Sequence, residues 1–362
     1  MRVRQATTGV GGRPRGNSRS SSTLSQREAL AHRSEHTDGV APEVQEIVER
    51  VRNAISCCDG LLVSTPATLE GVLAAVGVGY LAHVPHERMR LCVTSSAQPM
   101  LGEAFETIPE VLPEGLASLA RRVYAGLQTR LAATCPRAQE GRCPARCSGE
   151  CALKLAWACA SDSKGMPESV HRYVVRCFAE GAGAAQDATD PVTAEVDALA
   201  RQVMGECEHA RQFVRFSHMA DDTLGASFSP NADVLPFVSR HFARRMREER
   251  FYVVDPVHAT AIFHDRGWKA CEVARLDAQT VSGLAGRGDL APDERYVRAL
   301  WKRFYDGLEL KGRDASQRGY DLRKGWMPVR FWRGLFELDP RSDDPGPHVP
   351  ERYQGGRRNR PA

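Results

Sequence analysis

The amino-acid sequence predicts an α+β fold: a helix-rich single domain with a small antiparallel sheet and disordered basic tails at both ends. Two observations support this prediction. Apolar residues recur at helical spacing in several segments, for example over residues 44–55 and 116–131. By contrast, the apolar runs at 251–254, 259–264 and 268–273 are short and separated by turn residues, which is typical of a meander of strands.

Length, composition and charge set the expected boundaries. The chain has 362 residues and is 42% hydrophobic, which is enough apolar material for a buried core. We place the domain at residues 57–338. Residues 1–40 carry seven arginines against three acidic residues and lack apolar periodicity, so we expect a disordered tail there, with an organellar transit peptide as the alternative. Residues 339–362 are predicted to form a second disordered basic tail.

Local signals locate individual elements. A buried strand is predicted at residues 60–64, followed directly by a helix with Thr65 as N-cap and Pro66 in the first turn. Asp233 is predicted to cap another helix that ends near Arg247, with an apolar stripe on one face and arginines elsewhere.

Cysteine content and hydropathy indicate the compartment. Eleven cysteines, an odd number, in a chain long enough to bury its own core disfavour a secreted disulfide framework. The longest uncharged apolar run, residues 71–82, is shorter than the roughly 20 residues that cross a bilayer. The N-terminus has no apolar segment of the secretory type. We therefore expect a cytoplasmic protein that does not insert into membranes.

Five cysteines form a cluster that raises the question of a metal centre. They are Cys135, Cys143, Cys147, Cys151 and Cys159. Thiolates are natural ligands of zinc and of iron–sulfur clusters, but the three central cysteines recur every four residues, as on one stripe of a helix. On a helix the outer two would be about 12 Å apart and could not share one ion. We therefore expect packed or surface thiols and no cofactor, with a metal-binding protein as the alternative.

Signals of catalysis are weak. Asp255 and His258 lie close together at a predicted turn and are candidates for an acid and a base. No known triad or metal-ligand spacing connects them with other residues. The sequence also lacks a Walker loop and a dinucleotide-binding fingerprint. An enzyme would therefore need an unrecognised site.

Six short motifs follow one another in the second half of the chain. In order they are Arg211-Gln212-Phe213-Val214-Arg215-Phe216, Val234-Leu235-Pro236, His241-Phe242-Ala243-Arg244-Arg245, Val254-Asp255-Pro256, Leu300-Trp301-Lys302-Arg303-Phe304 and Met327-Pro328-Val329-Arg330-Phe331-Trp332. This series resembles the bacterial family described as probable DNA metabolism protein. Members of that family are typically encoded beside a radical-SAM protein proposed to act in DNA modification or repair, and the same domain occurs fused to uracil-DNA-glycosylase-type domains. The five-cysteine segment departs from the family pattern.

The resemblance implies an accessory protein in DNA repair or DNA modification that works with a radical-SAM partner, binds DNA, or does both. Arginines neutralise phosphates, so the candidate DNA contacts are Arg215, Arg240, Arg244, Arg245, Arg313 and Arg330. An arginine that instead pairs with a buried carboxylate would stabilise the fold. The alternative function is a nucleic-acid-processing enzyme that uses Asp255 and His258.

Overall fold

A helix-rich α+β architecture extends through the described part of the chain. The computed structural model describes residues 41–135, 146–286, 290–307 and 327–335, so both predicted tails lie outside the described residues. Helices predominate and the strands form two small sheets, which confirms the predicted fold class. No helix within these ranges is both long and apolar enough to span a membrane.

The first lobe is built on a three-stranded parallel sheet. Its strands are β1 (Gly60–Thr65), β2 (Met89–Val93) and β3 (Glu103–Thr107), in the spatial order β2-β1-β3. Helix α3 (Leu69–Leu81) connects β1 to β2, because parallel neighbours need a crossover that returns the chain to the same end of the sheet. The sequence predicts only β1 of these strands, so this parallel sheet adds to the predicted antiparallel one.

Several helices pack with this sheet and form the first apolar core. They are α2 (Pro42–Cys57), α4 (Glu114–Ala133), α6 (Arg146–Cys159), α7 (Met166–Glu180) and α8 (Ala182–Gln186). Helix α2 precedes the expected domain start at residue 57, yet Val44, Ile47, Val48 and Val51 are buried in this core. The apolar core therefore begins before that boundary.

The start of α3 differs from the predicted one. Thr65 is the last residue of β1, is fully buried and pairs with Val93 of β2, so it cannot leave the sheet to cap a helix. Thr68 is the N-cap instead, and its Oγ1 accepts a hydrogen bond from the Gly71 amide at 3.0 Å. The predicted strand and helix are both present, with a short connection between them.

The second lobe contains a five-stranded sheet. Its strands, in spatial order, are β4 (Ser217–His218), β5 (Leu224–Ser227), β6 (Phe251–Asp255), β7 (Thr260–His264) and β8 (Glu272–Arg275). The predicted meander is present as β6, β7 and β8, which pair antiparallel, but its third strand begins at Glu272 and not at Trp268. Strands β5 and β6 are parallel, because helix α10 (Leu235–Arg245) crosses over between them.

Both faces of this second sheet are covered. Val253 and Ile262 share a core with α10, whereas Val254 and Ala261 pack with Val281 of the helix α11. Alternate residues of a strand point to opposite faces, so β6 and β7 are buried on both sides. The other elements are α11 (Ala278–Ala285), α12 (Glu294–Gly307) and the 3₁₀ segments η1 (His86–Arg88), η2 (Thr94–Ser96) and η4 (Val329–Gly334).

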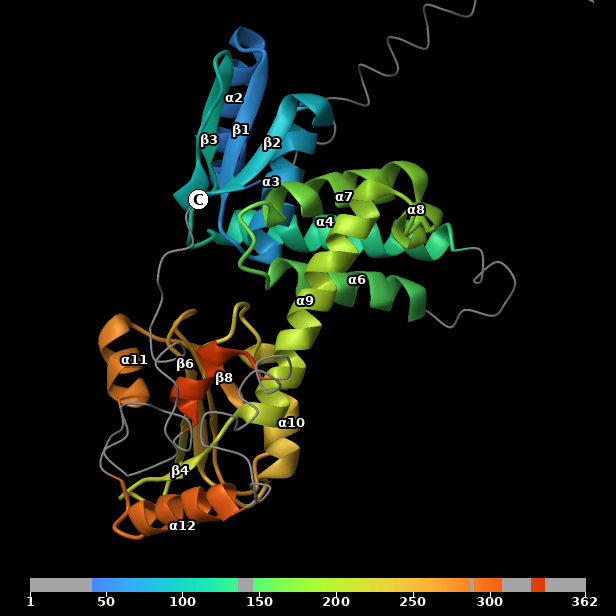
Figure 1. The fold of residues 1–362 in the computed structure, drawn as a ribbon. Coiled ribbons are helices and arrows are strands. Elements are labelled where there is room, and N and C mark those ends of the chain that lie inside the picture. Colours follow the sequence, from blue (N-terminus) through green and yellow to red (C-terminus); the bar gives the residue numbers. More distant parts are fainter. Residues whose placement is uncertain (1–40, 136–145, 287–289, 308–326, 336–362) are drawn as a thin grey trace, which may run out of the picture.

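Helix α9 (Pro191–Phe213) runs from the first lobe into the second (Figure 1). Val196 and Leu199 in its first half belong to the core of the first lobe. Val203 and Cys207 in its second half belong to the core of the second lobe, together with α10. One continuous helix thus contributes to both cores.

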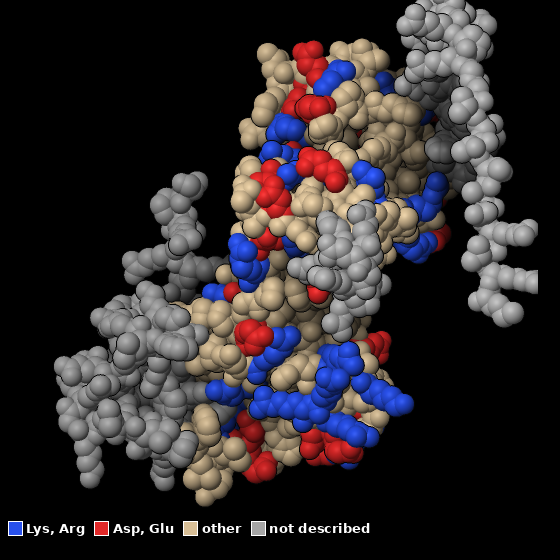
Figure 2. Space-filling view, turned by 90° about the vertical axis from the view of Figure 1, so that its right-hand side faces the viewer, with Lys and Arg blue, Asp and Glu red and all other residues tan. Residues whose placement is uncertain are grey.

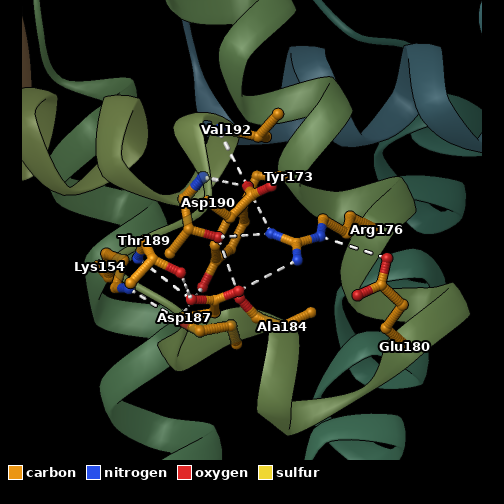
Figure 3. A network of polar contacts seen from close by, with 11 residues as sticks. Lys154, Tyr173, Arg176, Glu180, Ala184, Asp187, Thr189, Asp190 and Val192 are labelled. Carbon is orange, nitrogen blue, oxygen red and sulfur yellow. Dashed lines mark hydrogen bonds and ion pairs between the residues drawn. The ribbon is translucent and has the colours of Figure 1, made fainter.

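A network of charged side chains holds the start of α9 (Figure 3). Asp190 is the N-cap, and its Oδ1 accepts a hydrogen bond from the Val192 amide at 2.9 Å. Arg176 of α7 forms ion pairs with Asp190, with Asp187 at 3.5 Å and with Glu180 at 3.3 Å. The charge of Arg176 is therefore compensated within the protein.

Candidate nucleic-acid interface

Helix α10 presents arginines to solvent because of its sequence spacing. Leu235, Val238 and Phe242 recur at helical intervals and are buried against the sheet of the second lobe. The positions that remain on the outer side include Arg240 and Arg244, one turn apart, and all three arginines of this helix are exposed.

Asp233 does not cap α10 as predicted. The N-cap position is Val234, without a side-chain cap hydrogen bond. The Asp233 carboxylate instead forms an ion pair with Arg275 of β8 at 2.7 Å. That pairing draws the carboxylate away from the amides at the start of the helix.

The outer side of α10 and the second half of α9 together line a pocket of about 500 Å³. Its lining residues are Arg211, Phe237, Arg240, His241, Arg244 and Arg245. We refer to this concavity as the α10 pocket. Lys and Arg side chains gather on the side of the second lobe that carries α10, with acidic side chains at the border of the patch (Figure 2). The pocket thus combines four guanidinium groups, one imidazole and one phenyl ring.

The positive charge of the α10 pocket is largely uncompensated by described groups. Arg211 forms an ion pair with Glu208, its neighbour on α9. Arg240, Arg244 and Arg245 form no salt bridge with any carboxylate of the described residues. Like charges repel, so this surface is electrostatically suited to an anion.

His241 lies among these cations as a neutral ring. Burial lowers its pKa from the ordinary value, and the nearby positive charges of Arg211 and Arg245 lower the pKa further, against a smaller opposing effect of Glu208. The Nε2 atom is buried and has no hydrogen-bond partner within the described part of the chain. An anion in the pocket would supply the counter-charge that the arginines around this ring lack.

The other predicted DNA contacts lie elsewhere. Arg215 follows the end of α9, outside the pocket lining, and its Nη1 donates a hydrogen bond to the Gln212 carbonyl at 3.2 Å. Arg330 of η4 pairs with the buried carboxylate of Glu206. Its role is therefore to stabilise the fold, as expected from the sequence for an arginine that pairs with a buried carboxylate. Arg313 lies outside the described residues.

The pocket contains residues that the sequence does not predict as contacts. Arg211 and His241 belong to the motif series, but only the packing of α9 on α10 brings them together. Phe237 is also a lining residue. The signal available in the sequence is the helical spacing of Phe237, Arg240, His241 and Arg244, which places these side chains on neighbouring positions of one helix surface.

The two predicted catalytic residues do contact each other. Asp255 ends β6 and is fully buried, and its Oδ2 lies 2.5 Å from Nδ1 of His258. On the other side of the ring, Nε2 of His258 lies 2.7 Å from Oδ1 of Asp162, which follows α6 of the first lobe. Burial favours the neutral ring, but hydrogen bonds and charges from the two aspartates outweigh it and raise the pKa of His258 to about 10.

This Asp255–His258–Asp162 cluster has the geometry of an ion bridge. A general base needs a ring nitrogen that is free to take a proton from substrate. Both nitrogens of His258 are occupied by carboxylates, and the ring is a cation at neutral pH. The cluster therefore ties the segment after α6 to the turn after β6.

Three cysteines of the five-cysteine segment are buried in the structure. Cys147, Cys151 and Cys159 lie on α6, in keeping with the helical stripe. Cys135, Cys151 and Cys159 are buried, and burial raises the pKa of the Cys151 and Cys159 thiols. Within the described residues no three His, Cys, Asp or Glu side chains are arranged to hold a metal ion. Cys143 lies outside these residues.

Comparison with known proteins identifies one region of the chain. No curated protein and no solved structure matches the chain. Residues 164–337, which begin just before α7 and extend just beyond the described residues, match the family model of a domain of unknown function, DUF4130. The match includes the whole α10 pocket together with Asp255 and His258, and it begins two residues after Asp162. The α10 pocket thus lies within the region that is similar to this domain of unknown function.

Proposed function

We propose that this protein binds DNA through the α10 pocket and its surroundings, as an accessory protein in DNA repair or DNA modification. The observation that carries the proposal is the exposed group Arg240, Arg244 and Arg245, which lines one concavity without carboxylate partners among the described residues. Guanidinium groups of this kind neutralise backbone phosphates and release the counterions of DNA.

The resemblance to the DNA metabolism family favours DNA over other polyanions. The same resemblance is the basis for proposing a radical-SAM protein as the partner. Arg244 and Arg245 belong both to the motif series and to the pocket lining, so the sequence and the geometry support the same surface. Arg330 is withdrawn from the proposed contacts because its charge is used by Glu206.

The proposal can be tested by fluorescence anisotropy with a labelled oligonucleotide at several salt concentrations. Arg240→Ala, Arg244→Ala and Arg245→Ala should each weaken binding to a similar extent for any base sequence. Each should also lower the slope of log affinity against log salt by about one unit, because one phosphate contact is lost. Melting curves of the variants check that the fold is intact.

Arg266→Ala is the matched control. Arg266 is also an exposed arginine of the second lobe, with 60% side-chain exposure, but its Nη2 pairs with Asp222 at 2.8 Å and it lies outside the pocket. This variant removes the same charge and should leave affinity nearly unchanged. Equal losses in Arg266→Ala and in the α10 variants, or no wild-type binding at low salt, would contradict the proposal.

A further inference from the structure

The shape of the α10 pocket suggests a more specific ligand than a duplex backbone. Backbone phosphates require only an exposed basic surface, whereas this site is a concavity of about 500 Å³. That volume lies within the range of about 300–1,000 Å³ found for pockets that bind small molecules. A concavity of this volume is large enough for a single nucleotide at the end of a strand.

The charge of the pocket exceeds that of one phosphodiester. Arg211, Arg240, Arg244 and Arg245 all line it, and Glu208 compensates only Arg211 among the described residues. A phosphodiester carries one negative charge. A phosphomonoester carries about 1.5 to 2 negative charges near neutral pH and three acceptor oxygens, which match a cluster of guanidinium donors better.

One wall of the pocket is aromatic. Phe237 lines the site, and its ring packs against Trp157 of α6 with ring centroids 6.5 Å apart. Aromatic side chains provide a surface on which an unpaired base stacks, without regard to sequence. Arginines and a phenyl ring in the same concavity therefore correspond to the two parts of a nucleotide.

We propose that the α10 pocket binds the phosphorylated terminal nucleotide of a DNA strand. The arginines and His241 surround the terminal phosphate, and Phe237 contacts the base. This inference rests on the proposed DNA-binding function and adds the chemical group that the pocket recognises.

His241 links this binding to pH. The charged groups that face it are Arg211 and Glu208 from α9 and Arg245 from its own helix, and Arg240 and Arg244 line the same pocket. A bound phosphate opposes the effect of the arginines and stabilises the protonated ring. Binding of the phosphate then favours proton uptake by His241, so the contribution of this ring to affinity increases as pH falls. Protonation of the phosphate itself, with a second pKa of about 6, acts in the opposite direction.

The test uses three single-stranded oligonucleotides of identical sequence that carry a 5′ phosphate, a 3′ phosphate or no terminal phosphate. Anisotropy at constant ionic strength should show about tenfold tighter binding of at least one phosphorylated strand, as expected for the loss or gain of charge-assisted hydrogen bonds. Inorganic phosphate should compete with this preference more strongly than chloride at the same ionic strength.

Two variants distinguish binding in the α10 pocket from nonspecific electrostatic attraction of DNA to the protein. His241→Phe keeps a ring of similar size beside Phe242 but removes both ring nitrogens. It should reduce the preference for a phosphorylated end and its dependence on pH between about 6 and 8, where the phosphate itself also titrates. Arg266→Ala should retain the full preference.

The outcomes distinguish the two proposals. If the wild type binds all three strands with equal affinity, the protein binds DNA but the terminal-phosphate inference is wrong. If His241→Phe retains the full preference with the wild-type pH dependence, the pocket is not where the end is bound. If no strand is bound at low salt, the proposed DNA-binding function fails, and the inference fails with it.

Discussion

Arginines occupy two contrasting regions of this protein. At the start of α9, Arg176 forms ion pairs with Asp190, Asp187 and Glu180, so its charge is compensated by its own chain (Figure 3). In the α10 pocket, Arg244 and Arg245 lie close to other arginines and to a neutral histidine, without a carboxylate from the described residues. The same type of side chain thus stabilises the fold in one region and is available to a ligand in the other.

Basic residues of these two kinds differ in what they contribute to the protein. A cation that neutralises a buried or capping carboxylate contributes to folding, and its loss leaves that carboxylate unpaired. Cations that gather without counter-charge repel one another, so such a group lowers stability unless an anion binds. Arg330 belongs to the first class because of Glu206, although its sequence setting resembles that of the second class.

The largest effect is expected at His258, the cation compensated on both sides. Its pKa is raised from 6.5 in the unfolded chain to about 10 in the folded protein. The stabilisation is therefore fully present below pH 6.5 and is lost as pH rises toward 10. The slope of unfolding free energy against pH cannot exceed about 1.4 kcal/mol per unit for this group. Denaturant unfolding at several pH values between 6.5 and about 10 measures this slope.

His258→Gln isolates this contribution. The variant leaves the fully buried Asp255 without its cation and should lose about 3 kcal/mol at pH 7. Its stability should also fall less steeply toward pH 10 than that of the wild type. Parallel pH curves for the two proteins would show that His258 does not carry the ion bridge.

The next largest effect is expected for Arg330→Ala. The change leaves Glu206, which is 6% exposed, without its guanidinium partner, so we expect a loss of about 3 kcal/mol or less, given that Arg330 itself is partly exposed. DNA binding should keep its salt slope, because Arg330 does not line the α10 pocket. Arg330→Lys serves as the control that retains the charge. A reduced salt slope in Arg330→Ala with an unchanged melting temperature would show that Arg330 contacts DNA and does not stabilise the fold.

The sequence predicts those parts of the fold that have strong local signals. The meander of β6 to β8 follows from short apolar runs between turn residues, and α10 follows from its apolar stripe. The sequence does not predict strands β2 and β3, because the charged residues Arg90 and Glu103 interrupt their apolar pattern. In the structure these side chains lie 2.6 Å apart in an ion pair. Only the parallel pairing of both strands with β1 makes that arrangement favourable.

The candidate site was predictable to a similar degree. The exposure of Arg240, Arg244 and Arg245 follows from helical spacing, and the structure shows it. The contribution of Arg211 depends on how α9 packs on α10, which no local pattern reveals. In the same way, Asp162 is 96 residues from His258 in sequence, so its contact with the ring could not be inferred from spacing.

A moderate effect is expected at the start of α9. Asp190→Ala removes the N-cap and one partner of Arg176, and should lower the free energy of unfolding by about 1 to 2 kcal/mol. Asp190→Asn preserves the cap but not the charge, so it should recover most of the loss if capping dominates. Thermal melting of both variants measures how much of the stabilisation comes from the cap and how much from the ion pair. Equal losses in the two would instead assign the stabilisation to the ion pair.

The smallest effect on stability is expected for Arg244→Ala and Arg245→Ala. These variants test most directly whether the arginines of the α10 pocket differ from Arg176, whose charge is compensated. Both side chains are exposed and have no carboxylate partner among the described residues, so each change should alter the free energy of unfolding by less than about 0.5 kcal/mol. Removing one cation also relieves repulsion with its neighbours, which offsets part of any loss. Arg176→Ala is the matched variant, and it should be clearly less stable than either. If the α10 variants lose as much stability as Arg176→Ala, these arginines are also compensated within the protein, and the charge of the α10 pocket is not available to a ligand.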